Sequence, residues 1–169
     1  MVSKKLKAES GVVVRGDCTT DRMPLAEGAF EAEQVVDAMA ERCPQLDCQV
    51  LEHLALTYGT ASADVLALVE RDPGFGARVV PHMPYIRAEV PYAIQHEMAM
   101  TLNDWMIRRT HIMHEDEEQG LGCAAQVAAM MAPHLDWDTA EKERQMHAYN
   151  EQVRLSQSYH IDSTPQVKR

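Results

Sequence analysis

Apolar residues recur at helical spacing along most of this 169-residue chain. Three such stretches precede residue 75, and they predict helices over about 30–43, 46–58 and 63–69. Pro44 blocks continuation of the first helix, and Gly59 supplies a left-handed stop for the second. Ser62 is placed to cap the third helix, which the turn Asp72-Pro73-Gly74 ends.

The longest apolar pattern begins at Pro91, whose missing N–H suits the first turn of a helix. Apolar residues cover most sides of this pattern up to about His114, so we expect one long, central and mostly buried helix over 91–114. An acidic turn at 115–118 follows, helped by Gly120 and Gly122. A small-residue helix over 123–131 and a last helix capped by Asp136 or Asp138 complete the pattern.

These elements predict an all-α fold, a single compact bundle of about six helices around one long central helix. The composition agrees, since the chain is 46% hydrophobic but only 5% aromatic, as helices packed on helices require. We expect three regions along the chain. Residues 1–29, with the short run Val12-Val13-Val14, are a linker or a remnant of a preceding domain, 30–160 form the helical domain, and 161–169 form a frayed tail.

Charge and targeting signals exclude several classes of partner. A formal net charge of −10 disfavours binding to nucleic acid or to anionic lipid. No run approaches the length of a membrane span, and no apolar region follows the basic start as in a signal peptide. We therefore expect a cytoplasmic protein.

The four cysteines show no metal-binding spacing. Cys18, Cys43, Cys48 and Cys123 form neither a CxxC motif nor two close doublets. A disulfide between Cys43 and Cys48 would fit the turn between two helices, but a cytosolic location favours free thiols.

A family resemblance emerges along the predicted long helix. The residues that carry it are Ala88-Glu89-Val90-Pro91-Tyr92-Ala93-Ile94, His96-Glu97-Met98-Ala99-Met100-Thr101-Leu102-Asn103-Asp104 and Arg108-Arg109-Thr110. Tyr58-Gly59-Thr60 and the segment Cys18-Thr19-Thr20-Asp21-Arg22-Met23-Pro24-Leu25 precede them in the expected order. Together they resemble the C-terminal domain of FAD-dependent glycerol-3-phosphate dehydrogenases and α-glycerophosphate oxidases, from about Cys18 to Tyr149.

The resemblance implies an accessory domain rather than a catalytic one. In this family glycerol 3-phosphate is oxidised to dihydroxyacetone phosphate, with electrons passing to flavin and onward to quinone or oxygen. The flavin and substrate sites belong to a large N-terminal domain, which would be this chain's partner, so residues 1–29 are a linker or a remnant of that flavin domain. We expect no catalytic residue, cofactor or metal in the chain itself, and membrane contact would come only through the parent enzyme. Homo-oligomerisation and activity of the isolated chain stay open.

The glycines give the same expectation. A dinucleotide site needs a glycine-rich turn between a strand and a helix. Neither Gly74-Phe75-Gly76 nor Gly120-Leu121-Gly122 follows a predicted strand or continues to a third glycine. FAD is therefore expected in the parent enzyme and not in this chain.

Two groups of polar residues on the long helix are candidate sites. His96 and Glu97 begin a zinc-protease-like pattern, but Met100 stands where the second histidine is needed. His111 and His114 could hold a metal at a helix end, although such a cluster is more often a solvated helix C-terminus.

The second group is a polar seam, which we define as Glu97, Thr101, Asp104, Arg108 and Arg109. The first four project within about 60° on a continuous helix. They form either an internal salt-bridge network or a surface that docks on the flavin domain near its active-site entrance. Two rival functions stay open: a free-standing helical protein-interaction module, and a small metal-dependent enzyme using His96, Glu97, His111 or His114.

Overall fold

The structure is a computed structural model that describes residues 32–162, with side chains from Glu33 to Ser158. The segment predicted as a linker over 1–29 and its Val12-Val13-Val14 run lie outside the described residues. So does nearly all of the tail predicted over 161–169.

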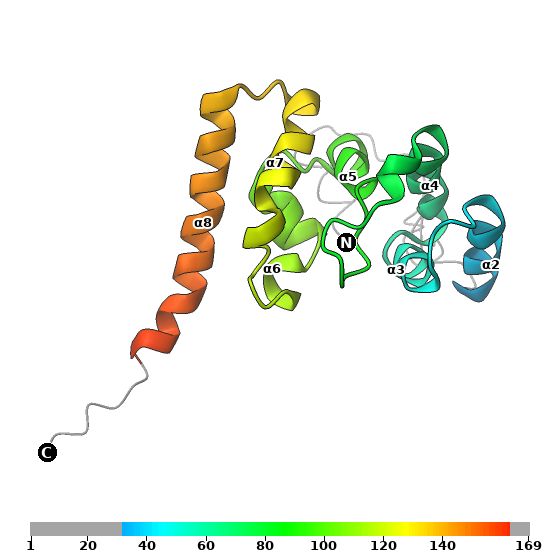
Figure 1. The fold of residues 1–169 in the computed structure, drawn as a ribbon, viewed down its shortest axis with the longest axis horizontal. Helices are drawn as coiled ribbons and strands as arrows, with labels where there is room; N and C mark the ends of the chain where they lie inside the picture. Colours follow the sequence, from blue (N-terminus) through cyan, green and yellow to red (C-terminus); the bar gives the residue numbers. More distant parts are fainter. Residues whose placement is uncertain (1–31, 163–169) are drawn as a thin grey trace, which may run out of the picture.

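The described residues fold into helices and turns, which confirms the all-α prediction (Figure 1). Their α-helices are α2 (Ala32–Arg42), α3 (Cys48–Tyr58), α4 (Ser62–Arg71), α5 (Glu89–Glu97), α6 (Ile112–Glu115), α7 (Leu121–Leu135) and α8 (Thr139–Asp162). Three short elements join them: the 3₁₀ helices η1 (Gly59–Ala61) and η2 (Pro73–Gly76), and the π-helix η3 (Asp104–Arg109). None of the described helices combines the length and apolar character needed to cross a bilayer.

The ends of the first helices follow the signals in the sequence. Helix α3 starts where the Asp47 carboxylate accepts a hydrogen bond from the Val50 N–H at 3.1 Å, and it ends at Gly59 with φ 53°. Ser62 differs from its predicted role, because it is the first residue of α4 and its hydroxyl donates to the Gly59 carbonyl at 2.7 Å. Asp72 accepts from the Gly74 N–H and ends this region as predicted.

The prediction of a single long helix over 91–114 is wrong. Helix α5 ends at Glu97, Met98 adopts the left-handed conformation (φ 57°, ψ 39°), and the chain restarts as η3 and then α6. The restart has a local cause: the Thr101 hydroxyl accepts from the Asp104 N–H, and the Asp104 carboxylate accepts from the Thr101 N–H. This reciprocal pair is a capping box, which begins a new helix instead of extending the old one.

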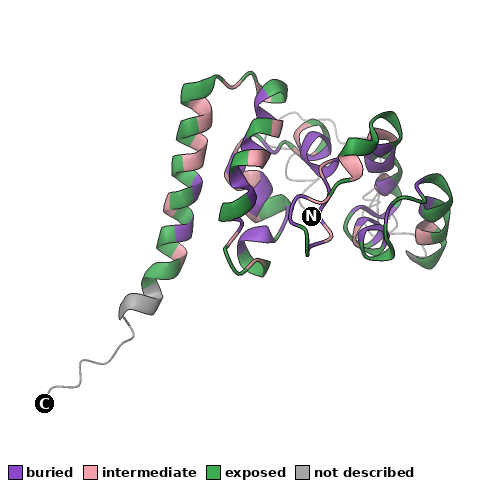
Figure 2. Ribbon diagram, viewed as in Figure 1, coloured by how far each residue is buried: buried purple, intermediate pink, exposed green. Residues whose placement is uncertain are grey.

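Two clusters of buried side chains form the core (Figure 2). The first cluster comes mainly from α2, α3 and α4, and the second from α5, η3, α6, α7 and α8. Helix α5 contributes to both, since Tyr92 belongs to the first cluster and Val90 and Ala93 to the second. It therefore holds the central position that the sequence assigned to a longer helix.

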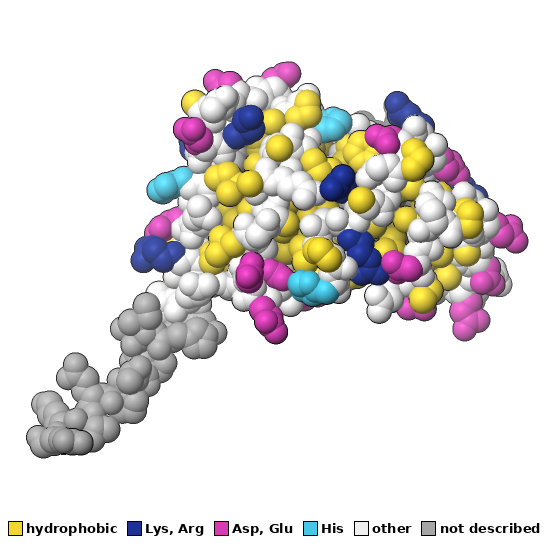
Figure 3. Space-filling model, viewed as in Figure 1, with side chains coloured by type: hydrophobic (Ala, Val, Ile, Leu, Met, Phe, Trp, Pro, Cys, Tyr) yellow, Lys and Arg dark blue, Asp and Glu magenta, His cyan; other side chains and the backbone are white. Residues whose placement is uncertain are grey.

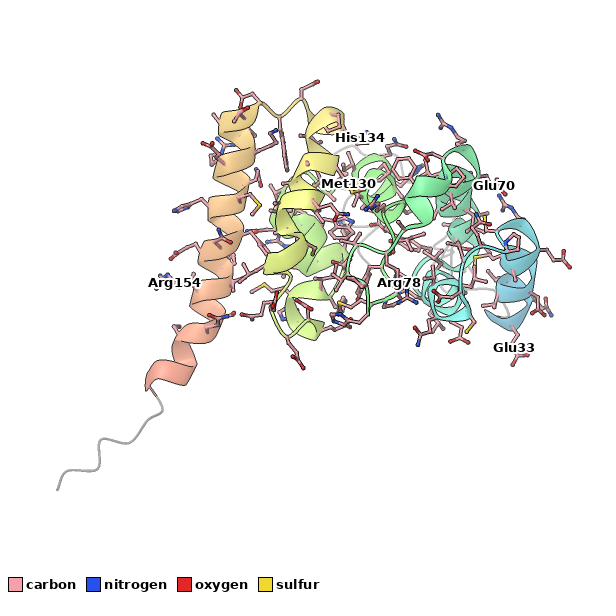
Figure 4. All side chains as sticks on the ribbon, in the orientation of Figure 1. Glu33, Glu70, Arg78, Met130, His134 and Arg154 are labelled. Atoms are coloured by element: carbon pink, nitrogen blue, oxygen red, sulfur yellow. The ribbon has the colours of Figure 1, made fainter. Side chains whose placement is uncertain are left out.

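Ion pairs fasten the elements around this core. Arg42 of α2 pairs with Glu70 of α4 at 2.9 Å. Arg78, labelled in Figure 4, donates to the Met83 carbonyl at 2.7 Å and to the Asp47 carboxylate at 2.8 Å, which fixes the 78–86 loop against the start of α3. The Arg78 guanidinium accordingly lowers the pKa of Asp47 below its ordinary value.

The two ends of the molecule differ. Helix α8 stands beside α7 and continues beyond it (Figure 1), anchored by the buried side chains of Tyr149 and Val153. Of the two residues predicted to cap the start of α8, Asp138 is the one that does so, since its carboxylate accepts a hydrogen bond from the Glu141 N–H at 2.7 Å. The opposite end carries acidic side chains over α2 (Figure 3), whose sequence includes Glu33, Asp37 and Glu41.

Candidate functional site

The seam residues lie around the break between α5 and η3 rather than along one helix. The break brings them together as two pairs. Arg108 donates to the Asp104 carboxylate at 2.6 Å, and Arg109 donates to the Glu97 carbonyl at 2.7 Å with its Nε 3.7 Å from the Glu97 carboxylate. Thr101 completes the capping box with Asp104. All five predicted residues therefore occupy one region, although the helical-wheel reason for expecting this was incorrect.

Asp104 is held as a charged acceptor at the centre of the break. Its carboxylate accepts from the N–H groups of Met100 at 3.2 Å and Thr101 at 2.9 Å. Partial burial acts to raise the pKa of Asp104, but the hydrogen bonds from Thr101, the Arg108 guanidinium and the Met100 N–H outweigh it and lower that pKa. The group thus stays ionised and keeps η3 capped at neutral pH.

The three residues at the end of the motif, Arg108-Arg109-Thr110, have different roles. Thr110 is buried, and its hydroxyl and N–H both reach the Trp105 carbonyl at 2.8 Å, which ends η3. Arg109 reaches back to the last carbonyl of α5, where a cation is favoured. Arg108 is the more exposed arginine, with 63% of its side chain accessible. The arginines therefore present cationic groups to solvent while Thr110 closes the helix.

Two methionines at the break are unusually exposed for apolar side chains. Met98 is 78% and Met100 52% exposed, whereas Ala99 between them is fully buried. Buried Ala99 ties the segment down, since its N–H donates to the Ala93 carbonyl at 3.1 Å. We call this region, formed by Met98, Met100 and the seam, the docking surface, after the hypothesis that the seam docks on a flavin domain.

A buried carboxylate at the start of α5 was not singled out by the sequence analysis. Glu89 is fully buried in the first turn of α5. It accepts from the Tyr58 hydroxyl at 2.9 Å and the Ile86 N–H at 2.7 Å, and it lies 2.9 Å from His53 Nε2. Its position inside the apolar run Ala88-Glu89-Val90 was the one signal that could have marked it, because a charge there needs buried partners.

The Glu89 cluster connects the two halves of the core. Burial, and then the Glu89 charge, raise the pKa of Tyr58, so its hydroxyl remains a donor. Trp105 Nε1 donates to the Glu89 carbonyl at 3.3 Å, linking α5 to η3. The His53 ring packs edge-on against Tyr85, and burial raises the pKa of Tyr85 to about 12. The cluster therefore joins α3, the 78–86 loop, α5 and η3 by directional contacts.

The histidines that are candidate metal ligands do not lie together as a ligand set. His96 stacks on Tyr92 at 4.7 Å between ring centres, and His111 precedes α6. No group of three or more His, Cys, Asp and Glu side chains within the described residues is arranged to hold a metal ion. The geometry thus offers the metal-enzyme hypothesis no ligand set there.

A groove beside these elements has an acidic lining. It has a volume of about 510 Å³ and lies between the 79–82 loop and the turn at 115–118. His82 Nε2 is 3.2 Å from the Asp116 carboxylate, and Asp116 also accepts from the Gly120 N–H. Cys123 lines the groove as a free thiol, and burial raises its pKa to about 11. Such a thiol is protonated at neutral pH and is a poor nucleophile.

The glycine pairs do not form a nucleotide-binding turn. Gly74 and Gly76 lie in the 3₁₀ helix η2, and Gly120 follows the acidic turn before α7. A phosphate-binding turn joins a strand to a helix N-terminus, and neither described pair follows a strand. These residues do not fit a flavin dinucleotide, and we place none on them. Cys43 and Cys48 are free thiols, as the sequence favoured.

Comparison with known proteins finds the same family along most of the chain. Residues 18–142 match the model for the C-terminal domain of alpha-glycerophosphate oxidase. A glycerol-3-phosphate dehydrogenase of Synechocystis sp. is 32% identical over 134 residues, which are 79% of this chain and 24% of the relative.

Two further relatives carry related names. Glycerol-3-phosphate dehydrogenase 2 of Mycobacterium tuberculosis is 33% identical over 122 residues, 70% of this chain and 21% of the relative. The mitochondrial glycerol-3-phosphate dehydrogenase of Homo sapiens is 33% identical over 105 residues, 60% of this chain and 14% of the relative. The chain thus spans between 14% and 24% of these relatives. Since most of its length matches one family model, this chain belongs to the family of the C-terminal domain of alpha-glycerophosphate oxidase.

Proposed function

We propose that this chain is the accessory C-terminal domain of an aerobic-type FAD-dependent glycerol-3-phosphate dehydrogenase and is not catalytic by itself. The parent enzyme would oxidise glycerol 3-phosphate to dihydroxyacetone phosphate and pass the electrons to quinone. In this proposal the domain packs against the flavin- and substrate-binding region and supports it. The observation that carries the proposal is the match to a C-terminal domain by a chain spanning a quarter or less of its relatives.

The docking surface supports this role. It combines exposed apolar side chains, Met98 and Met100, with arginines held in defined positions by Asp104 and Glu97. Interfaces between domains typically pair an apolar centre with a polar rim. The alternative of a purely internal salt-bridge network explains the arginine pairs, but it gives no reason for apolar side chains exposed beside them.

A replacement experiment tests the proposal. Three forms of the Synechocystis relative would be compared: intact, lacking the segment matched by this chain, and with this chain in that segment's place. We expect the deletion to lose flavin or activity at least tenfold, and the chimera to recover most of both. Flavin absorbance and its bleaching by glycerol 3-phosphate are the measurements.

Each other outcome counts against the proposal. A deletion variant as active and as stable as the intact enzyme would mean that the domain supports neither activity nor stability. A chimera that stays inactive although its helical content is intact would favour a free-standing interaction module. The purified chain alone should not oxidise glycerol 3-phosphate, and catalysis by it would also contradict the accessory role.

A further inference from the structure

Met98 occupies a backbone conformation that favours a different residue. With φ 57° and ψ 39° it forms the left-handed end of α5, and its N–H donates to the Ala93 carbonyl. Glycine is preferred at this position because an L side chain is strained there, and asparagine or aspartate is tolerated better than other residues. A methionine is therefore an unfavourable choice for the local backbone.

The Met98 side chain makes little apolar contact within this chain that could offset the backbone strain. Met98 is 78% exposed, so it buries little apolar surface here, while its neighbour Ala99 is fully buried. The other described non-glycine residues with positive φ differ in this respect. Gln119 bonds to Ser156 and Gln157, and Asp136 belongs to the class that tolerates the conformation. Strain kept without internal benefit indicates a contact outside the chain.

The charges around Met98 are already paired. Arg108 is neutralised by Asp104, and Arg109 by Glu97, within the docking surface itself. A partner would gain little from adding further carboxylates, because these arginines have acceptors in place. The unsatisfied component of the surface is apolar, and a flexible methionine adapts well to a recess of irregular shape.

We infer that Met98 is the anchor of the docking surface and enters an apolar recess on the flavin- and substrate-binding region that precedes this domain in its relatives. The inference rests on the proposed function and adds which side chain makes the central contact and what chemistry receives it. The relatives supply the occupant, since 76% or more of their length lies outside the matched segment. Arg108 and Arg109 form the polar rim of the contact.

Methionine oxidation reads out the contact directly. Hydrogen peroxide converts an accessible methionine thioether to the sulfoxide and is itself reduced to water. In the isolated chain Met98 should be oxidised much faster than the buried Met113. In the active chimera the rate at Met98 should fall at least tenfold, while the rate at Met146 on α8 stays the same. An active, flavin-loaded chimera in which Met98 reacts as fast as in the isolated chain would overturn the inference and leave the proposed function intact.

Replacing Met98 with glycine separates an anchor from a merely structural residue. In the isolated chain Met98→Gly relieves strain and should raise Tm by about 2–4 °C. In the chimera the same substitution should weaken docking and raise the oxidation rate of Met100 several-fold. Asp136→Gly is the matched control at the other exposed left-handed helix end, and it should leave Met100 oxidation unchanged. Unchanged protection of Met100 in the Met98→Gly chimera would refute the anchor role, whereas a chimera that never becomes active refutes the proposed function instead.

Discussion

At the residue scale, packing around Gly120 requires a glycine, whereas the turn alone would only favour one. The φ of 71° at this residue already favours glycine. An added Cβ would also lie 2.5 Å from Met106 Cε and 2.8 Å from both Ile112 Cγ2 and the Tyr149 hydroxyl. The sequence marked this residue as a helper of the acidic turn. The close approach of η3, α6 and α8 to it depends on tertiary packing.

We therefore expect Gly120→Ala to destabilise the domain by about 2–4 kcal/mol, from overpacking together with backbone strain. Urea unfolding followed by circular dichroism measures the change. Gly122→Ala is the control, since a Cβ there meets only the Glu118 carboxylate at 3.3 Å and the position is inside α7. That variant should be neutral or slightly more stable, and equal losses for the two variants would refute the packing argument.

At the element scale, the break after α5 shows where periodicity misleads. The apolar spacing over 91–114 was real, because Leu102, Trp105 and Ile112 are all buried. Periodicity does not, however, tell one long helix from two helices that share a core face. Thr101-Leu102-Asn103-Asp104 has the spacing of a capping box, with aspartate in place of the usual glutamate, and this local signal outweighs continuation. No residue in the sequence predicts the left-handed turn at Met98, since methionine is not a residue that favours this conformation.

The variant Asp104→Asn should distinguish the contribution of the Asp104 capping hydrogen bond from that of its negative charge. An amide oxygen can still accept from the Thr101 N–H, but the ion pair with Arg108 is lost, at a cost of about 0.5–1 kcal/mol at pH 7. The pKa of Asp104 is lowered by folding, so its contribution is complete above the ordinary value of 3.8 and is lost as pH falls through the lowered value.

The free energy of unfolding of the wild type should consequently fall more steeply below about pH 4 than that of Asp104→Asn. Urea titrations at a series of pH values between neutral and acid give both slopes. Parallel slopes would mean that Asp104 is not the titrating cap.

At the scale of the whole molecule, Glu89 joins two core clusters that come from different halves of the chain. Its carboxylate holds Tyr58 and His53 of α3 and the Ile86 N–H, while its carbonyl accepts from Trp105 of η3. Fully buried, the charge is stable only with all these donors in place. The domain should therefore unfold as one cooperative unit.

Glu89→Ala tests this coupling. Two buried donors, the Tyr58 hydroxyl and the Ile86 N–H, would lose their acceptor, and His53 would lose its partner. We expect a loss of about 3 kcal/mol or more in the free energy of unfolding. Fluorescence of Trp105 and Trp137 reports on the second cluster, whereas far-ultraviolet circular dichroism reports on all helices. The two signals should coincide in the wild type and separate in the variant, with α2–α4 melting first. Glu89→Gln, which keeps the shape, should show a smaller separation, and coincident curves in all three proteins would disprove the coupling.

The sequence by itself determined the helical class, the ends of α2, α3 and α7 to within a few residues, and the family, because these depend on local periodicity, stop signals and an ordered motif. It also named the five seam residues. Only the tertiary structure decided that Glu89 is buried among donors from three other elements and that Met98 stands exposed in a left-handed turn. The physical reason is that the first depends on groups brought together from distant parts of the chain and the second on the solvent exposure of one side chain, and neither quantity is encoded in a local pattern.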